Sequence, residues 1–198
     1  MVSRPSEAPA EPGTSAPLPV KIVVAGGFAV GKTTFVGSIS EIEPLSTEAA
    51  MTSVSEGVDD TSKVSSKTTT TVAMDFGRLS LGNDLILYLF GTPGQDRFWF
   101  MWDDLVRGAI GAVVLVDSRR LDECFPAVDY FEEYGIPFVV AINMFEGHVF
   151  HDLDAVKEAL AVSGDTPVIS VDARERESTK TTLLELVQHA LVRAGAST

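Results

Sequence analysis

A glycine-rich segment carries the most specific chemical pattern in the sequence. Residues 26–34 read Gly-Gly-Phe-Ala-Val-Gly-Lys-Thr-Thr, in which a glycine is followed by four residues and then by Gly-Lys-Thr. The β-forming residues 20–25 precede this segment, and helix-forming residues follow it. In that context the segment folds into a nest of backbone N–H groups that wraps an oligophosphate. The pattern therefore predicts a nucleotide phosphate-binding loop. The alternative is a chance match in a turn between a strand and a helix.

The residue types in this loop fit the chemistry of phosphate binding. Gly26 and Gly31 let the chain approach phosphate oxygens in conformations that a Cβ disfavours. Lys32 supplies a positive charge to the β- and γ-phosphate oxygens, and the Thr33 hydroxyl is a Mg²⁺ ligand. The helix that begins at Lys32 adds its positive end to the same place. The predicted nucleotide-binding residues of the loop are Gly26, Phe28, Ala29, Val30, Gly31, Lys32, Thr33 and Thr34.

Composition restricts the class of protein. A chain of 198 residues with 45% hydrophobic content can form one domain with a sizeable core. Its net charge of −13 argues against binding to a nucleic-acid backbone. Cys124 is the single cysteine, which excludes an intrachain disulfide and favours a reducing compartment. No apolar run is long enough to span a bilayer, so we expect a cytoplasmic protein that reaches a membrane only through a partner.

The segments around the loop predict an α/β fold. Residues 1–19 are rich in Pro, Ala, Ser and Glu and are predicted to be a disordered tail, with the domain in residues 20–198. The expected strands are residues 20–25, 72–81, 85–90, 112–116, 138–142 and 167–171, and the expected helices are residues 32–40, 119–133, 152–162 and 178–193. This alternation predicts a three-layer fold with a six-stranded, mostly parallel sheet and one antiparallel edge strand. Ligand sites then lie at the carboxyl ends of the strands.

Residues 41–70 are rich in Ser, Thr, Glu and Asp and show no apolar period. A structureless segment of that length inside a compact domain is usually functional or disordered. Because it follows the helix of the phosphate loop, we expect it to fold over a bound nucleotide.

Three motifs, in order, resemble those of Ras-like small GTPases with the P-loop NTPase fold. They are the phosphate loop, the strand that opens at Thr71, and Gly-Gln-Asp-Arg-Phe at residues 94–98. Residues 89–100, Leu-Phe-Gly-Thr-Pro-Gly-Gln-Asp-Arg-Phe-Trp-Phe, are similar to the GTPases of actinobacterial conservons, which are bacterial relatives of the GTPase MglA. The resemblance implies a GTP-binding molecular switch that requires Mg²⁺ and hydrolyses GTP to GDP slowly on its own.

The resemblance also assigns residues to the last phosphate. Thr71 matches the threonine that reaches Mg²⁺ and the γ-phosphate, although a β-forming threonine at a strand start is the alternative. Gly94 matches the glycine whose N–H meets the γ-phosphate. Gln95 matches the residue that orients the attacking water, and an ordinary turn residue is the alternative. The predicted catalytic residues are Gln95 and Lys32, and the predicted Mg²⁺ ligands are Thr33 and Thr71.

Two departures from the Ras-like pattern affect these assignments. Gly91 stands where an aspartate usually holds the hydration shell of Mg²⁺, so we expect weak Mg²⁺ binding and slow turnover. The base-reading motif becomes Asn143-Met144-Phe145-Glu146. The Glu146 carboxylate can accept from two guanine N–H groups, which adenine does not offer, and an ordinary turn residue is the alternative. By resemblance, the N–H of Ala173 is aimed at the guanine carbonyl.

The resemblance implies a Roadblock-type regulatory protein and a sensor-kinase-like membrane complex as partners. The aromatic residues 98–102 are either a partner surface exposed in one nucleotide state or the packing of a helix against the sheet. Two other functions stay open: a nucleotide-binding scaffold with negligible hydrolysis, and a kinase that uses the same loop.

Overall fold

Six strands lie where the apolar patterns predict them. The computed structural model describes residues 16–43, 45–52, 69–94, 100–145 and 151–196. The expected strands are β1 (Leu18–Gly26), β3 (Thr69–Leu81), β4 (Leu85–Gly91), β5 (Ala109–Val116), β6 (Phe138–Asn143) and β7 (Val168–Val171). Continuous burial along β5 and β6 explains their unbroken apolar runs, since both faces of these strands are covered. β1 begins at Leu18, slightly inside the predicted tail, and residues 1–15 lie outside the described part of the chain.

The strands form one sheet in the order β2-β3-β4-β1-β5-β6-β7. β1 lies at its centre and runs parallel to β4 and β5, and the parallel pairing continues through β6 and β7. β3 is antiparallel to both of its neighbours. The predicted α/β P-loop fold, with a mostly parallel sheet and one antiparallel strand, is therefore confirmed.

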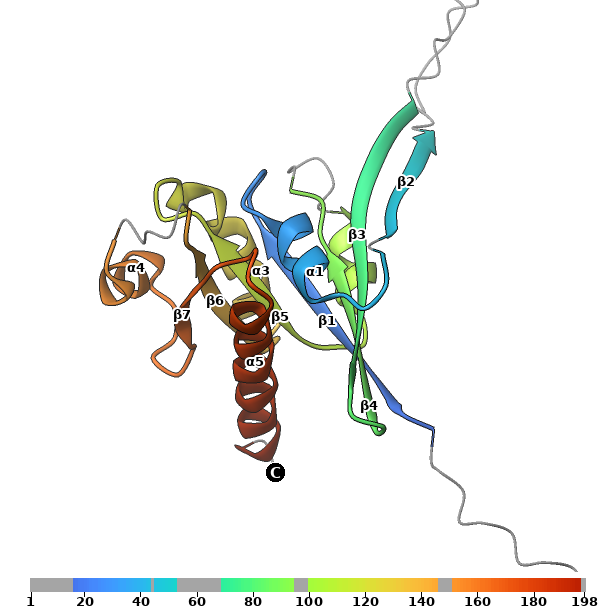
Figure 1. Ribbon diagram of the computed structural model, residues 1–198. Helices are drawn as coiled ribbons and strands as arrows, with labels where there is room; N and C mark the ends of the chain where they lie inside the picture. Colours follow the sequence, from blue (N-terminus) through green and yellow to red (C-terminus); the bar gives the residue numbers. More distant parts are fainter. Residues whose placement is uncertain (1–15, 44, 53–68, 95–99, 146–150, 197–198) are drawn as a thin grey trace, which may run out of the picture.

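One strand was not predicted. β2 (Leu45–Thr52) lies in the segment expected to be structureless, and it makes a seventh strand that displaces β3 from the edge of the sheet. It pairs only with the upper part of β3, and together they form an arm that extends beyond the body of the domain (Figure 1). Its sequence, Leu-Ser-Thr-Glu-Ala-Ala-Met-Thr, contains Glu and Ala residues that disfavour strands, so pairing with β3 rather than local propensity defines it.

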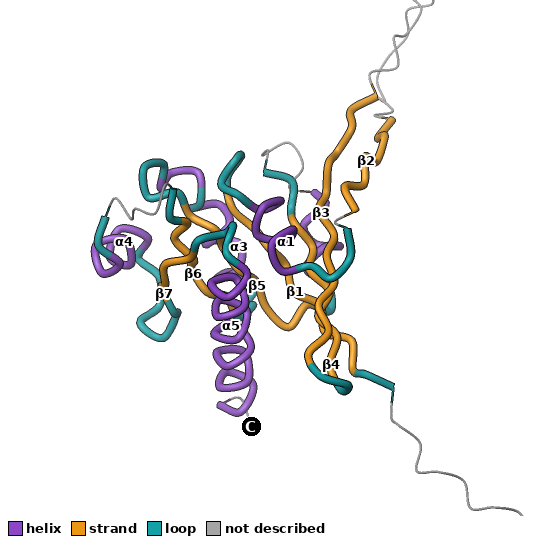
Figure 2. The backbone as a smooth tube through the Cα atoms, in the orientation of Figure 1, coloured by secondary structure: helices purple, strands orange, loops and turns teal. Residues whose placement is uncertain are grey.

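Helices cover both faces of the sheet and make three layers (Figure 2). They are α1 (Lys32–Ile39), α2 (Trp102–Val106), the 3-10 helix η2 (Leu121–Glu123), α3 (Phe125–Glu133), α4 (Leu153–Leu160) and α5 (Arg176–Ala196). Successive β1 residues point to opposite faces: Ile22 packs in the core with α1 and α5, and Val23 packs in the core with α2, α3 and α4. Within the described part of the chain, none of these helices has the length and hydropathy needed to cross a bilayer.

The helix predicted at residues 119–133 begins later than expected. Its first residues form a turn and η2, and α3 starts only at Phe125. Pro126 stands in the first turn of α3, where a missing N–H costs nothing, and this sets the start of the helix. The later start leaves Arg119 and Arg120 in a connection at the carboxyl end of β5, where they can face the phosphate loop.

Candidate functional site

The predicted phosphate loop connects the central strand β1 to α1. Gly26 has a φ of 134° and Gly31 a φ of 107°, a region of backbone conformation that favours glycine. A Cβ on Gly31 would also lie 2.7 Å from Nδ2 of Asn143. Val30 is buried in the core beneath the loop, whereas Phe28 and Ala29 are exposed. The loop is therefore anchored from below, and its two outer residues border the solvent.

The Lys32 side chain lies inside this loop. Its Nζ donates hydrogen bonds to the carbonyl oxygens of Gly26, at 2.9 Å, and Gly27, at 2.6 Å. Burial lowers the pKa of Lys32 to about 8, and the nearby carboxylates of Asp75 and Glu123 oppose this shift. The ammonium group is thus a largely desolvated charge surrounded by main-chain groups, an environment in which phosphate oxygens are strong partners.

Gly94 lies directly against this lysine. A Cβ on Gly94 would be 2.7 Å from Nζ of Lys32 and 3.0 Å from Cα of Phe28. The close approach requires a glycine here, and it brings the end of β4 to the phosphate loop. The structure thus brings together Lys32 and Gly94, two residues that the sequence assigns to the γ-phosphate.

A carboxylate that the sequence analysis missed completes this side of the site. The Thr33 hydroxyl donates a hydrogen bond of 2.7 Å to Oδ2 of Asp75 on β3. Asp75 lies beside Gly91: a Cβ on Gly91 would be 3.1 Å from the Asp75 Cβ and 3.2 Å from its Oδ2. A carboxylate of the neighbouring strand therefore lies beside the position that Gly91 leaves without a side chain. The expectation of weak Mg²⁺ binding stays a prediction.

Strand register contains the signal that could have identified Asp75. β3 and β4 pair through the turn after Leu81, from Leu81 with Leu85 to Phe76 with Phe90. Continuing this register by one residue places Asp75 across from Gly91. A charged residue at that register position, beside the phosphate loop, is a candidate ligand rather than a surface residue.

The oxygen atoms gathered here suit Mg²⁺. Thr33 and Asp75 offer a hydroxyl and a carboxylate, and oxygen ligands are those that Mg²⁺ prefers. The buried hydroxyl of Thr92 has no hydrogen-bond partner among the described residues. A bound water or ion commonly satisfies the hydrogen-bonding capacity of such a group. The described residues contain no group of three His, Cys, Asp or Glu side chains that could hold a metal.

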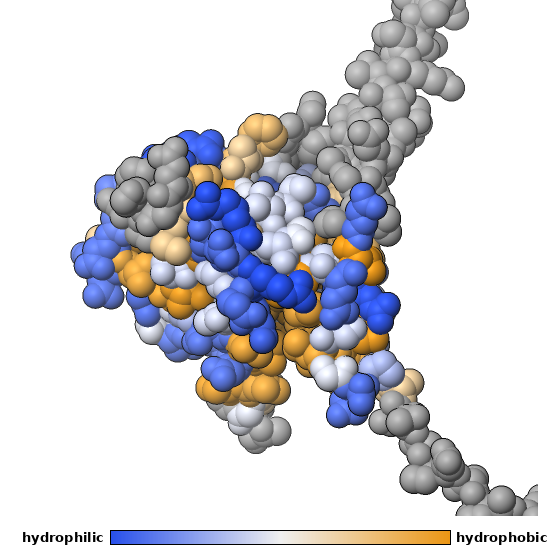
Figure 3. Space-filling model, viewed as in Figure 1, coloured by the Kyte–Doolittle hydropathy of each residue, from blue (hydrophilic) through white to orange (hydrophobic). Residues whose placement is uncertain are grey.

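A cleft of about 380 Å³ joins these groups. It is lined by Phe28, Ala29, Gly31, Lys32, Thr33, Thr34, Asp75, Thr92, Pro93 and Gly94. A larger groove of about 640 Å³ lies at the opposite, amino-terminal end of the strands, lined mainly by apolar residues such as Leu18, Leu87 and Val187. It continues into hydrophobic surface along the end of α5 (Figure 3), where Leu191 is exposed. A polyphosphate requires donors and positive charge, so the smaller cleft is the candidate site.

Asn143 links the phosphate loop to the region predicted to read the base. Its Nδ2 donates to the Val30 carbonyl at 2.9 Å, and its Oδ1 accepts from the Ala173 N–H at 3.1 Å. The side chain thus ties together the loop, the end of β6 and the connection between β7 and α5. In this arrangement the Ala173 N–H is bound to Asn143, and it would have to exchange partners to bind a guanine carbonyl.

Three predicted site residues have side chains outside the described part of the structure. Gln95 and Glu146 lie outside the described residues. The backbone of Thr71 lies in β3 and pairs with Ala50 of β2, and its side chain is not described. The roles assigned to these residues remain predictions.

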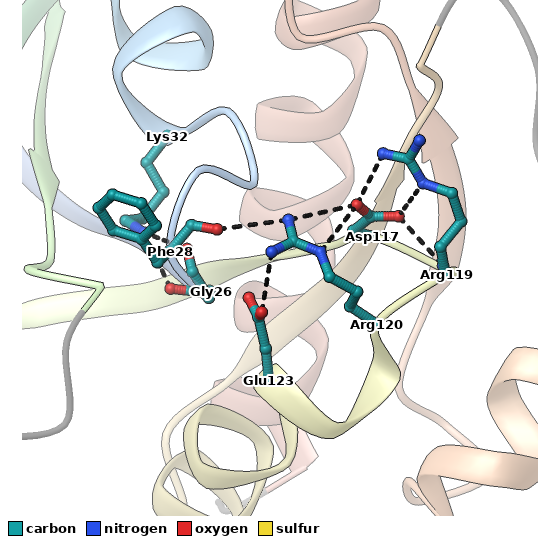
Figure 4. A network of polar contacts seen from close by, with 8 residues as sticks. Gly26, Phe28, Lys32, Asp117, Arg119, Arg120 and Glu123 are labelled. Carbon is teal, nitrogen blue, oxygen red and sulfur yellow. Dashed lines mark hydrogen bonds and ion pairs between the residues drawn. The ribbon is translucent and has the colours of Figure 1, made fainter.

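A charged network that the sequence did not reveal borders the phosphate loop (Figure 4). Asp117 follows β5 and is 3% exposed, and Arg119 donates to its two carboxylate oxygens, each at 2.8 Å. These hydrogen bonds hold the pKa of Asp117 below its usual value, against the effect of burial. The Arg119 guanidinium also lies 4.5 Å from the centre of the Phe145 ring, in the predicted base-reading segment. The buried carboxylate therefore fixes a cation beside that segment.

Comparison with known proteins finds a matching family and a relative. Residues 24–193 match the family described as conserved hypothetical ATP binding protein. The uncharacterized protein MJ1339 of Methanocaldococcus jannaschii is 32% identical over 126 residues, which are 63% of this chain and 69% of that protein.

Solved structures of GTPase domains have the same fold. The G-domain of FeoB from Methanococcus jannaschii has a TM-score of 0.56 at 15% identity, covering 87% of this chain and 97% of that one. The cytosolic domain of the T. maritima FeoB iron transporter in a GDP form has a TM-score of 0.62 at 16% identity, covering 89% and 65%. At these identities the likeness establishes a P-loop GTPase-like fold. The narrower resemblance to conservon GTPases stays a prediction.

Proposed function

The chain belongs to the family of conserved hypothetical ATP binding proteins, and on this premise we propose that it is a nucleotide-dependent switch that binds GTP and hydrolyses it slowly. The observation that carries the proposal is the grouping of Lys32, Thr33, Asp75 and Gly94 around one cleft. Lys32 offers charge, Gly94 lies close to it, and the Thr33–Asp75 pair provides oxygen ligands. Together they suit a triphosphate with Mg²⁺.

In the proposed reaction, water attacks the γ-phosphorus in line with the leaving diphosphate. Gln95 orients that water, and Lys32 and the N–H of Gly94 stabilise the charge that develops on phosphate oxygens. Mg²⁺, when bound, neutralises part of the phosphate charge; Thr33 and Asp75 would hold it, with Thr71 as the residue that responds to loss of the γ-phosphate. Lys32 has a third N–H donor beyond the two that bind carbonyl oxygens, and this donor can bind a phosphate oxygen.

We propose that the site prefers guanine and that Glu146 recognises this base. ATP is the second candidate, favoured by the description of the family and by the engagement of the Ala173 N–H with Asn143. Competition of GTP and ATP for the protein, measured with a fluorescent GDP analogue in the presence of Mg²⁺, decides between the two.

A switch also needs a surface that partners read. Trp102 is buried and packs on Tyr130 and Phe131, with ring centres 5.2 and 5.6 Å apart, so this part of the aromatic segment serves helix packing. Phe100, by contrast, is 61% exposed and suits a partner contact. We propose a Roadblock-type protein and a sensor-kinase-like membrane complex as partners, on the family resemblance alone.

The switch is tested by hydrogen exchange with GDP and with a non-hydrolysable GTP analogue. Slower exchange in residues 41–70 and 91–104 with the analogue is expected. Equal exchange in both complexes would leave the nucleotide-binding scaffold as the better description. Single-turnover hydrolysis, with and without a candidate partner, then separates a slow GTPase from a scaffold that does not hydrolyse. Transfer of the γ-phosphate to a second substrate instead of water would identify the less favoured kinase.

A further inference from the structure

Arg120 lies across the outer rim of the phosphate loop (Figure 4). Its Nη2 donates to the carbonyl oxygen of Phe28 at 3.4 Å, and its Nη1 donates to Oε1 of Glu123 at 2.8 Å. Nε and Nη2 contact Oδ2 of Asp117 at 3.3 and 3.4 Å. The side chain is 40% exposed, so one guanidinium touches the loop and retains access to solvent.

The two carboxylates hold Arg120 with different strength. Asp117 already receives two short hydrogen bonds from Arg119, and its contacts with Arg120 are about half an ångström longer. Glu123 makes the short contact, and it is a partly exposed residue of the 3-10 helix η2. The main restraint on the Arg120 side chain is therefore the pair with Glu123, an exposed kind of ion pair that contributes little and exchanges easily.

Glu123 itself lies unusually close to the phosphate loop for an anion. A Cβ on Gly27 would overlap the Glu123 carboxylate, and that carboxylate opposes the lowering of the Lys32 pKa, so its charge reaches the lysine. A carboxylate in this place repels a polyphosphate unless a cation neutralises it. Arg120 is the described cation that pairs with it.

We propose that Arg120 is the arginine that this chain supplies in cis to a bound triphosphate, held ready by Glu123. The proposal rests on the proposed function. Phe28, whose carbonyl Arg120 contacts, has its Cα 3.0 Å from the Cβ position of Gly94, the residue predicted to face the γ-phosphate. The Arg120 guanidinium therefore already touches the loop residue that packs against Gly94.

Hydrolysis of GTP develops negative charge that a cation such as Arg120 can stabilise. As water attacks, a bond forms between its oxygen and the γ-phosphorus, and the bond to the bridging oxygen breaks. The diphosphate leaves with the electron pair, and the proton of the water passes to the released phosphate. Negative charge grows on the bridging and γ-phosphate oxygens, and a guanidinium can donate to two oxygens at once. An arginine in this role accelerates hydrolysis by up to several powers of ten.

A structural role is the competing explanation: Arg120 would only brace the loop by neutralising Glu123 and Asp117. The test therefore uses four variants. Arg120→Ala removes the cation, Arg120→Lys keeps the charge without the planar fork, and Glu123→Gln weakens the restraint. Arg107→Ala is the matched control, because Arg107 is an exposed arginine that pairs with Asp104 at 3.5 Å and does not line the cleft.

Three quantities are measured for each variant: GDP affinity, affinity for the imido analogue of GTP, and the single-turnover rate with GTP. We expect Arg120→Ala to lower the rate at least about tenfold, with GDP affinity changed by less than about threefold. Arg120→Lys should recover part of the rate. Glu123→Gln should raise the rate of the bound GTP, because it frees the arginine side chain without removing it.

The proposal is overturned if Arg120→Ala weakens GDP and analogue binding equally and leaves the rate of the bound GTP unchanged. If the wild-type protein binds nucleotide but does not hydrolyse it, the ratio of analogue affinity to GDP affinity replaces the rate as the test. The proposal is then overturned if Arg120→Ala leaves this ratio unchanged. Wild-type protein that binds no purine nucleotide would instead refute the proposed function. The same series is run with ATP and ADP if adenine nucleotides bind more tightly.

Discussion

The cleft around Lys32, called here the phosphate half of the site, and the segments predicted to read the base, called the base half, are built in different ways. The phosphate half combines the loop after the central strand β1 with Asp75 of β3 and with the segment that follows β4, the strand between β3 and β1. The base half consists of connections after β6 and β7, joined through Asn143. Strand pairing places Asp75 in the first half, whereas the second half consists of segments that connect strands to helices. The fold therefore specifies phosphate binding more strongly than it specifies the base.

The largest effect is expected from removing the cation of the phosphate half. Lys32→Ala should weaken binding of GTP and ATP alike by at least about 100-fold, since it deletes charge-assisted hydrogen bonds in a desolvated position. Isothermal titration with both nucleotides measures the change. Lys180→Ala is the control, because Lys180 carries the same charge on the surface of α5, where it pairs with Glu177 at 3.7 Å. Unchanged nucleotide affinity in Lys32→Ala would contradict the assignment of Lys32 to phosphate binding.

The second prediction concerns the carboxylate supplied by β3. Asp75→Ala should weaken Mg²⁺ binding to the nucleotide complex by about 10- to 100-fold, the usual cost of removing a residue that supports metal binding. Nucleotide affinity in excess EDTA should change much less. Metal titrations that follow nucleotide affinity measure both quantities.

A pair of variants sharpens this test. Gly91→Asp alone should also weaken binding, because its Cβ would lie 3.1 Å from the Asp75 Cβ and would add a second negative charge. Combining it with Asp75→Ala removes the obstructing side chain and restores a carboxylate to the same place. Recovery of Mg²⁺ dependence in the double variant is expected; no recovery would mean that Asp75 acts only through the position of β3.

A smaller effect is expected in the base half. Glu146→Gln should reduce the preference for GTP over ATP by about 10- to 100-fold, since hydrogen bonds to a charged acceptor are lost for guanine alone. Affinity for ATP should be unchanged. Glu158→Gln, on the exposed face of α4, is the control. Equal loss for both nucleotides would show that Glu146 does not read the base.

The smallest effect concerns pH. Because the pKa of Lys32 lies near 8 and bound phosphate favours its charged form, triphosphate affinity should be constant well below pH 8 and fall above it. The expected loss between pH 7 and 9 is about tenfold, because a group with a pKa near 8 goes from about one-tenth to about nine-tenths neutral across this range. Affinity that rises with pH over this range would contradict the assignment.

The difference between the two halves also explains which features could be predicted from the sequence. Residues buried on both faces, as in β5 and β6, leave an apolar run that is visible without a structure, and the loop around Lys32 has a motif of its own. The position of Asp75 could have been predicted, because the hairpin register at Leu81 and Leu85 determines which residue lies opposite Gly91. From the sequence pattern alone, Asp75 was predicted only as part of a strand.

Other features depend on contacts that no local pattern records. β2 exists through its pairing with β3, although Glu48, Ala49 and Ala50 are poor strand formers. Arg120 reaches Phe28 from 92 positions away in the chain, and that contact depends on α3 beginning only at Phe125. Such side-chain networks follow from the tertiary arrangement, and they appear only after the strands have been placed.

The most direct measurement is the identity of the nucleotide that the purified protein carries or takes up in the presence of Mg²⁺, determined by chromatography after denaturation. We expect guanine nucleotide, and GDP to accumulate slowly from added GTP. Adenine nucleotide alone would retain the phosphate half and overturn the proposed base specificity. A protein that neither carries nor takes up any purine nucleotide would contradict the central claim that the loop around Lys32 is a triphosphate site.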